Sequence, residues 1–321
     1  MSAATRFLLT LFLATLPALA ATGPSATSLL ASGRVDDAIS SLHQTITHSP
    51  NDAEAHNLLC RAYFSLADWN RGVSDCQIAV SLDPNNSNYH LWLGRAYGEK
   101  ADKANFMSAA GLAKKARAEF ETAVQLDPTN VAAITDLAEF YLEAPGIVGG
   151  GRDKAEAEAR SLQTLDPAKA DWVHARIAEK KKDFPAAEKQ YRAAIQAGHG
   201  AASAWLNLGL FYKHSSRFDD MQEALHSVLA APVDRLEALF DAAEILVHTN
   251  RNLPDAAELL RRYLSAKTSV EQAPAFKAHY LLGTVLEKQG DKQAATQEYR
   301  AALGLARDFS PAQEALDRIN R

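Results

Sequence analysis

The residues best placed to do chemistry form a glycine-rich stretch from Gly146 to Gly151, followed by Arg152 and Lys154. A phosphate-binding loop needs the pattern G-x4-G-K-[ST] between a strand and a helix. Here Asp153 follows Arg152, the lysine is displaced, and the pattern before the loop is helical. We therefore predict a wide turn in which glycines adopt positive φ angles. An alternative is that Arg152 and the start of the next helix hold an anionic group of a partner.

Other candidates for catalysis or metal binding are scattered along the chain. The ten histidines form no H-E-x-x-H motif and no paired His/Cys spacing, and no G-x-S-x-G nucleophile motif occurs. We therefore predict no catalytic residue, no metal site and no cofactor. Two alternatives remain: a metal site built from distant segments of the chain, and an active site carried by the fold without a recognisable motif.

The charge balance and the N-terminal stretch bear on partners and location. The formal net charge of −5 offers no basic patch for nucleic acid and no polybasic run for a membrane surface. Arg6, the apolar run from Phe7 to Leu16, and Ala18-Leu19-Ala20 resemble a secretory signal peptide over residues 1–20, cleaved after Ala20. The run is shorter than the ~20 residues that a membrane-spanning helix needs. We expect an exported protein, in the bacterial periplasm or, alternatively, secreted.

The elements that must position any site are helices in repeated pairs. Trp205, Leu208, Gly209 and Tyr212 have the spacing W-x2-L-G-x2-Y, and related positions recur along the chain. This pattern resembles the first helix of a tetratricopeptide (TPR) unit, in which a small residue lets the second helix pack closely. The segment from Tyr141 to Ala155 also resembles exported bacterial TPR proteins.

The resemblance implies an all-α, right-handed superhelical TPR solenoid over residues 21–321, with seven to eight helix-turn-helix units. The clearest units are expected at about 53–86, 87–130, 131–167, 202–233 and 276–309. A capping helix is expected from Ser310, with that serine as its N-cap. Two units exceed the usual period, and their extra residues, near 99–110 and 144–151, are expected at the turn within each hairpin.

Cys60 and Cys76 are the only cysteines, and both fall in the second unit. Cys60 takes the small contact position of the first helix, and Cys76 lies where the second helix can face it. A disulfide closing a loop of ~15 residues would add roughly 3 kcal/mol in an oxidising compartment. The alternative, which we favour from sequence, is that both are small buried packing residues.

The resemblance also implies where a partner binds, because TPR proteins usually bind along the concave face formed by the first helices. Side chains expected there are Asn57, Arg61, Phe64, Asn88, Leu91, Arg95, Thr135, Glu139, Trp172, Arg176, Leu206, Leu210, Lys213, Lys277 and Tyr280. Arg61, Arg95 and Arg176 share one helical position and are predicted to form a broken basic row for a carboxylate-bearing peptide. The alternative is that they are ordinary solvated arginines.

The function expected from sequence is therefore a non-enzymatic scaffold or adaptor that binds a peptide or protein partner in the concave groove. An alternative is an accessory factor of bacterial envelope biogenesis that holds an enzyme or outer-membrane component in a complex. Fold-level analogy does not name the partner.

Overall fold

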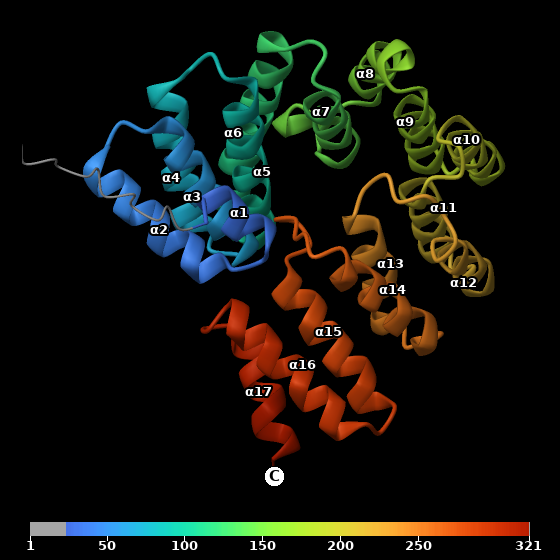
Figure 1. Ribbon diagram of the computed structural model, residues 1–321. Coiled ribbons are helices and arrows are strands. Elements are labelled where there is room, and N and C mark those ends of the chain that lie inside the picture. Colours follow the sequence, from blue (N-terminus) through green and yellow to red (C-terminus); the bar gives the residue numbers. More distant parts are fainter. Residues whose placement is uncertain (1–23, 321) are drawn as a thin grey trace, which may run out of the picture.

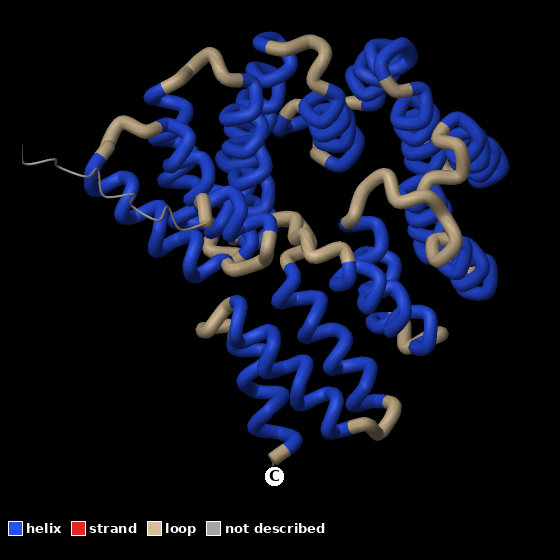
Figure 2. Tube along the Cα trace, in the orientation of Figure 1, coloured by secondary structure: helices blue, strands red, loops and turns tan. Residues whose placement is uncertain are grey.

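The computed structural model describes residues 24–320, and this part of the chain consists of helices and connecting turns, without strands (Figures 1 and 2). Successive helices form eight antiparallel pairs, and a last helix, α17, packs on α16. The pairs are α1 (Ala26–Ala31) and α2 (Val35–His48), α3 (Ala53–Ser65) and α4 (Trp69–Leu82), α5 (Ser87–Lys103) and α6 (Phe106–Leu126), α7 (Val131–Glu143) and α8 (Arg152–Leu165), α9 (Pro167–Lys180) and α10 (Phe184–Ala197), α11 (Ala202–His214) and α12 (Phe218–Ser227), α13 (Glu237–His248) and α14 (Leu253–Ser265), and α15 (Ala275–Lys288) and α16 (Lys292–Leu305), followed by α17 (Ser310–Ile319). The predicted all-α repeat solenoid is confirmed.

In units three, six and eight the two helices pack closely because a glycine of the first helix faces the second. A Cβ atom added at Gly209 would lie 2.6 Å from the side chain of Leu225, and one added at Gly283 would lie 2.6 Å from Tyr299. Gly94 meets Phe120 in the same way. These glycines therefore set the distance between the two helices of their units.

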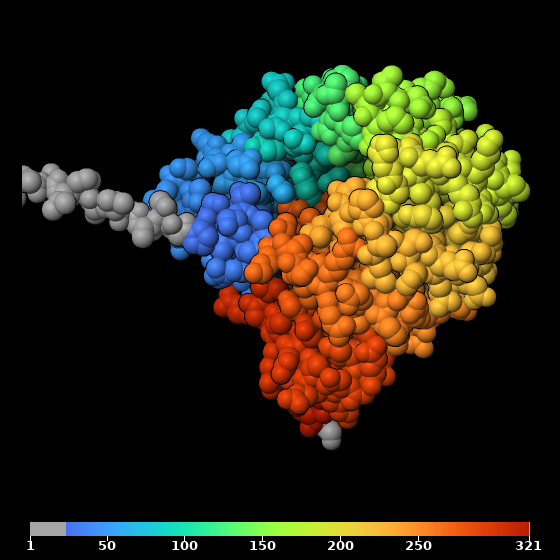
Figure 3. Space-filling model, turned by 45° about the vertical axis from the view of Figure 1, so that its right-hand side comes forward, coloured from blue at the N-terminus to red at the C-terminus, as the bar shows by residue number. Residues whose placement is uncertain are grey.

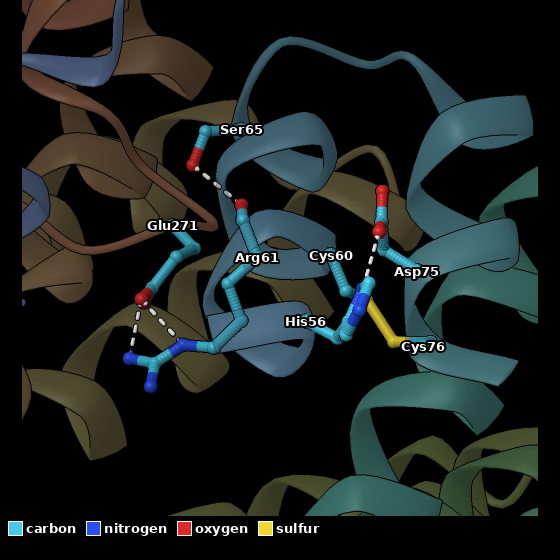
Figure 4. Close-up of a disulfide and its surroundings, with 7 residues drawn as sticks. All are labelled: His56, Cys60, Arg61, Ser65, Asp75, Cys76 and Glu271. Carbon is cyan, nitrogen blue, oxygen red and sulfur yellow. Dashed lines mark hydrogen bonds and ion pairs between the residues drawn. A yellow bond between two sulfur atoms is a disulfide. The ribbon is translucent and has the colours of Figure 1, made fainter. Parts of the chain in front are cut away.

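In the second unit a disulfide replaces this glycine contact. Cys60 and Cys76, whose Cα atoms lie 5.2 Å apart, are joined to each other (Figure 4). They are 16 residues apart in sequence, as Leu225 is from Gly209. The preference for two free thiols, drawn from sequence, is therefore wrong. The same close approach that elsewhere demands glycine here brings the two sulfur atoms together.

The two insertions take different forms. In unit three the extra residues lengthen both helices, to 17 residues in α5 and 21 in α6, and Asn105 caps α6 by accepting a hydrogen bond from the Ser108 amide. The expectation of extra residues at the turn is therefore wrong here, since only Ala104 and Asn105 separate the helices. In unit four the insertion is the predicted wide turn. It contains the short 3-10 helix η1 (Gly146–Val148), and Gly149 has a φ of 101°.

Helix α17 differs slightly from its predicted start. Phe309 is the N-cap and Ser310 is the first helical residue, with no side-chain capping hydrogen bond. Ala312 and Ala315 are fully buried, while Glu314 and Asp317 are exposed. The helix thus covers the apolar end of the array and presents a polar face to solvent, as a capping helix must.

The two ends of the repeat array meet. The Ser269 amide, in the segment between α14 and α15, donates a hydrogen bond to the Ala31 carbonyl at the end of α1, at 2.5 Å. The Arg307 amide donates to the Asp36 carboxylate of α2 at 2.9 Å. Apolar residues of the first two units and of units five to eight belong to one continuous buried cluster. We call this contact between first and last units the seam (Figure 1).

The segment between α14 and α15 is held in place for this contact. The buried Tyr263 hydroxyl donates to the Ala273 carbonyl, and the Ser269 hydroxyl accepts a hydrogen bond from the Ala275 amide at 2.9 Å. Gly33 fits against it because a Cβ atom there would come within 2.8 Å of the Ala275 Cβ. The seam is therefore a built contact and not a loose approach of two ends.

The predicted signal peptide, residues 1–20, lies outside the described residues. Among the helices of residues 24–320, none is both long and apolar enough to cross a membrane.

Candidate binding surface

The first helices of the units form one continuous surface. Consecutive first helices from α3 to α15 contact one another, whereas consecutive second helices make far fewer contacts. The array therefore curves toward the first helices. We call the side of α3, α5, α7, α9, α11, α13 and α15 that turns away from the second helices the inner face. Figure 3 shows a recess between the blue first units, the teal and green third and fourth units, and the orange seventh unit.

The three arginines of the predicted basic row each pair with a carboxylate of the protein itself. The Arg61 Nε donates to Glu271 at the seam, at 2.7 Å (Figure 4). The Arg95 Nε donates to Asp136 of α7 at 2.6 Å. Arg176 pairs with Glu143 and, at 2.9 Å, with Glu179. These carboxylates occupy the positions that a ligand's carboxylate was expected to take.

Four residues expected on the concave face are buried, so they present no side chain to a ligand. They are Asn57, Phe64, Leu91 and Leu206. Phe64 packs its ring edge-on against Trp69 and Trp92, at centroid distances of 5.3 and 5.5 Å. The apolar members turn toward the adjacent unit because stacking buries their side chains there.

The remaining predicted residues are exposed or partly exposed. Asn88 and Glu139 are exposed, and the partly exposed members are Arg61, Arg95, Thr135, Trp172, Arg176, Leu210, Lys213, Lys277 and Tyr280. The Asn88 side-chain carbonyl accepts a hydrogen bond from Asn130 at 3.3 Å, and the Thr135 hydroxyl donates to the Val131 carbonyl at 2.7 Å. Whether a partner binds these side chains stays a prediction.

Glu139 occupies the most distinctive position of this set. It is exposed, yet protein surrounds it, and this burial together with the carboxylates of Asp136 and Glu143 raises the pKa of its carboxyl group. Arg176 and Lys169 oppose that shift. No hydrogen bond to the Glu139 carboxylate is found within residues 24–320. The carboxylate is thus exposed at the inner face and free to accept a hydrogen bond from a partner.

Neighbouring charges link Glu139 to Lys169, Lys169 to Arg235, and Arg235 to Asp241. Burial and the neighbouring Glu244 raise the pKa of Asp241 to about 7. Burial and nearby Arg235 lower the pKa of Lys169, and burial lowers the pKa of Lys277, which lies near Glu244. Asp241, Glu244, Lys169 and Arg235 were not predicted from sequence. A sequence feature that could have revealed two of them is the i, i+3 spacing of Asp241 and Glu244, which places both on one face of the first helix of unit seven.

Hydrogen bonds between a histidine and a carboxylate recur within the units. The sequence analysis missed them because the histidines are scattered along the chain. His56 bonds to Asp75 at 2.9 Å and His279 to Glu298 at 2.6 Å, each from the first helix of a unit to the second, 19 residues on. His90 bonds to Glu119 in the same way at 2.6 Å. Aligning the repeats on their glycine positions reveals this set. Its place between paired helices indicates a structural role.

The glycine-rich turn contains no phosphate cradle. The Lys154 ammonium group donates to the Gly149 carbonyl at 2.9 Å. A Cβ atom at Gly149 would collide with the Arg117 side chain, so α6 already covers this side of the turn. Arg152 is exposed at the start of α8. Within the described range no group of three or more His, Cys, Asp or Glu side chains is arranged to hold a metal ion.

Stacked antiparallel helix pairs with small residues at their crossing points define a helical repeat solenoid. Profiles described as tetratricopeptide repeat match residues 29–90, 173–220 and 250–313. The chain belongs to the tetratricopeptide repeat family. Proteins of this family are in general non-enzymatic scaffolds that bind protein partners.

Two curated relatives and one solved structure are similar to this chain over part of their own length. The chain is 30% identical to mouse Superkiller complex protein 3 over 209 residues, which cover 62% of this chain and 13% of that protein. It is 24% identical to the human protein over 295 residues, covering 88% and 18%. The chain thus spans less than a fifth of these relatives. Yeast Tom70 has a similar fold, with a TM-score of 0.53, 15% identity, and coverage of 89% of this chain and 58% of that one.

Proposed function

We propose that this protein is a non-enzymatic, exported adaptor that binds a segment of a protein partner against its inner face. The observation that carries the proposal is Glu139, a solvent-exposed carboxylate of the inner face without a hydrogen-bond partner in the described residues. A charged donor of a partner would form a charge-assisted hydrogen bond with this carboxylate, which favours binding there.

The inner face favours a segment that carries positive charge, in place of the carboxylate-bearing peptide expected from sequence. Arg61, Arg95 and Arg176 are engaged by carboxylates, and a ligand carboxylate would have to displace them. Glu139 and Asp241 form no side-chain hydrogen bond or ion pair within residues 24–320, so both are available for charge-assisted contacts with a lysine or arginine of the partner.

Export is supported by the resemblance of residues 1–20 to a signal peptide and by the disulfide, since disulfides persist in oxidising compartments. A second candidate is an accessory factor of bacterial envelope biogenesis that holds an enzyme or outer-membrane component. It is favoured by the Tyr141–Ala155 segment and its resemblance to exported bacterial TPR proteins. The name of the curated relatives describes a subunit of a complex, which fits either role.

Site-specific crosslinking tests the binding surface. A photoreactive amino acid replaces Thr135, one helical turn before Glu139 on the inner face, or, as a control, the exposed Glu258 on the outer helix α14. We expect adducts with one defined protein from the inner position only. Adducts from Glu258 alone, or from neither position, contradict the proposal.

Export is tested separately by the N-terminus and the thiols. In the native host we expect the protein in the periplasmic fraction, beginning at Ala21, without free thiols after denaturation in the absence of reductant. An intact N-terminus and two free thiols in a cytoplasmic fraction would contradict export and leave the binding proposal standing.

A further inference from the structure

Three large apolar side chains stand almost fully in solvent. Phe106 is 93% exposed, Met107 90% and Ile147 84%, whereas every other exposed large hydrophobic residue between 24 and 320 is at most 45% exposed. All three belong to the two insertions. Phe106 and Met107 begin α6, and Ile147 lies in η1. Burial of such side chains is the ordinary rule, so their grouping on the inserted segments requires an explanation.

The α5–α6 insertion is shaped as a projection. With 21 residues, α6 is seven residues longer than a typical second helix of this chain, such as α8, which makes it about 10 Å longer. Asn105 caps its first turn, so Phe106 and Met107 are fixed at the end of a helical hairpin. The repeat units pack without this extension, since α3 and α4, for example, have 13 and 14 residues.

Lysines flank this projecting tip on both helices. Residues 99–115 contain Lys100, Lys103, Lys114 and Lys115 and two acidic residues, Glu99 and Asp102, in a chain with a net charge of −5. Lys114 lies seven residues from Met107, or about 10 Å along the helix, within roughly a Debye length. The lysines come from two helices, so the hairpin gathers a positive patch that no single run of the sequence contains.

The second insertion contacts the same helix at some distance from the tip. Helix α6 contacts η1, and Gly149 packs against the side chain of Arg117, which lies 11 residues, or about 16 Å, along α6 from Phe106. Ile147 is followed by the exposed Arg152. Each insertion therefore carries exposed apolar and basic side chains.

We propose that this tip, formed by Phe106 and Met107 with their flanking lysines, docks on an anionic phospholipid surface. Apolar side chains that enter the acyl boundary, together with lysines at headgroup level, are the combination by which peripheral proteins bind anionic membranes. A symmetric contact between two copies would bring like charges together. A few projecting side chains also offer far less area than the roughly 1,000 Å² expected of a stable protein interface.

The docking is tested by flotation of the purified full chain with vesicles. One set contains phosphatidylcholine alone and the other phosphatidylcholine mixed with phosphatidylglycerol. We expect binding to the anionic vesicles, at least tenfold weaker binding to the neutral ones, and loss of binding as salt rises. Residues 1–20 are common to all variants, so differences between variants report on the tip alone.

Two variants and a control separate the tip from the rest of the surface. F106S/M107S and a variant with glutamine at Lys100, Lys103, Lys114 and Lys115 should each bind anionic vesicles at least tenfold more weakly. I78S/L165S replaces two exposed apolar residues outside the insertions and should bind as the parent does. All must retain the parent's helical circular dichroism.

The proposal is overturned if the parent does not bind anionic vesicles, or if the tip variant binds them as well as the parent. It is also overturned if light scattering shows that the parent is a dimer and that F106S/M107S is a monomer, because the apolar tip would then be an interface between two copies.

Discussion

The contacts between neighbouring units and the contact at the seam are built differently. Neighbouring units stack through fully buried apolar residues such as Leu208, Leu246 and Leu260. The seam adds to its apolar part a backbone hydrogen bond, the Arg61–Glu271 ion pair and the close approach of Gly33 to Ala275. Stacking therefore holds the array together, whereas the seam determines how far the inner face is enclosed.

The largest effect is expected where stacking is broken. Leu260 of α14 is fully buried in the cluster shared by units five to eight. Leu260→Ala should lower the free energy of unfolding by about 2–5 kcal/mol, since it removes buried methyl groups and leaves a cavity. Urea denaturation followed by circular dichroism measures this. Glu258→Ala, at an exposed position of the same helix, should change stability by no more than about 0.5 kcal/mol. Equal effects of the two variants would show that α14 is not held by stacking.

Within unit two, the contribution of the disulfide to stability can be compared with that of stacking. C60A/C76A should lower stability by about 3 kcal/mol, because the cross-link limits the unfolded chain over 16 residues. The parent should lose a similar amount in reductant, whereas the double variant should not respond to reductant. A parent insensitive to reductant would show that the bond contributes little where stacking already holds α3 and α4.

The enclosed inner face predicts a pH dependence of stability. Burial and Glu244 raise the pKa of Asp241 from 3.8 to about 7 in the folded protein. Between pH 4 and 7 the unfolded chain gives up this proton while the folded protein keeps it, so stability must fall as pH rises and level off above 7. The loss should be on the order of 1–2 kcal/mol, allowing for the water that reaches this side chain.

Asp241→Asn should remove this fall, so that its stability exceeds the parent's by most at pH 8 and by least near pH 4. Urea denaturation at several pH values measures it, and Asp308→Asn, at an exposed site, should keep the parent's pH profile. A parent profile unchanged by Asp241→Asn would mean that Asp241 is well solvated and the inner face open.

The repeat units were predictable from sequence because each helix crossing requires a small residue at a fixed position of a short pattern. Gly94, Gly209 and Gly283 recur at one position of the W-x2-L-G-x2-Y pattern, and Cys60 stands at the equivalent place. The disulfide followed the same spacing, yet sequence alone could not separate a bonded pair from two packed thiols. The helical form of the α5–α6 insertion was missed because only its length, and not the helix-forming residues within it, was weighed.

The seam and the inner-face charges could not be predicted in the same way. Arg61 and Glu271 are 210 residues apart, and they meet only because small rotations between units add up along the array. An error in any one rotation would separate them. Glu139 was correctly placed on a first helix, but its surroundings depend on Lys169 and Arg176 of α9, whose unit has a degenerate pattern. Local periodicity therefore predicts which helix face a residue occupies, and not which distant residue lies opposite.

The smallest expected effect tests the seam itself with a matched pair of glycines. Gly33 and Gly290 both have positive φ angles, of 75° and 90°, so Ala at either site carries the same backbone strain of about 1 kcal/mol. Only at Gly33 would the added Cβ meet another part of the chain, the Ala275 Cβ at 2.8 Å, whereas nothing lies within 4 Å at Gly290. Gly33→Ala should therefore cost more than Gly290→Ala by about 1 kcal/mol, in line with overpacking. It should also speed hydrogen exchange at the Ser269 amide, which bonds across the seam, and Gly290→Ala should leave that amide unchanged. Equal exchange in the two variants would show that the first and last units do not hold each other in solution, and that the inner face lies open.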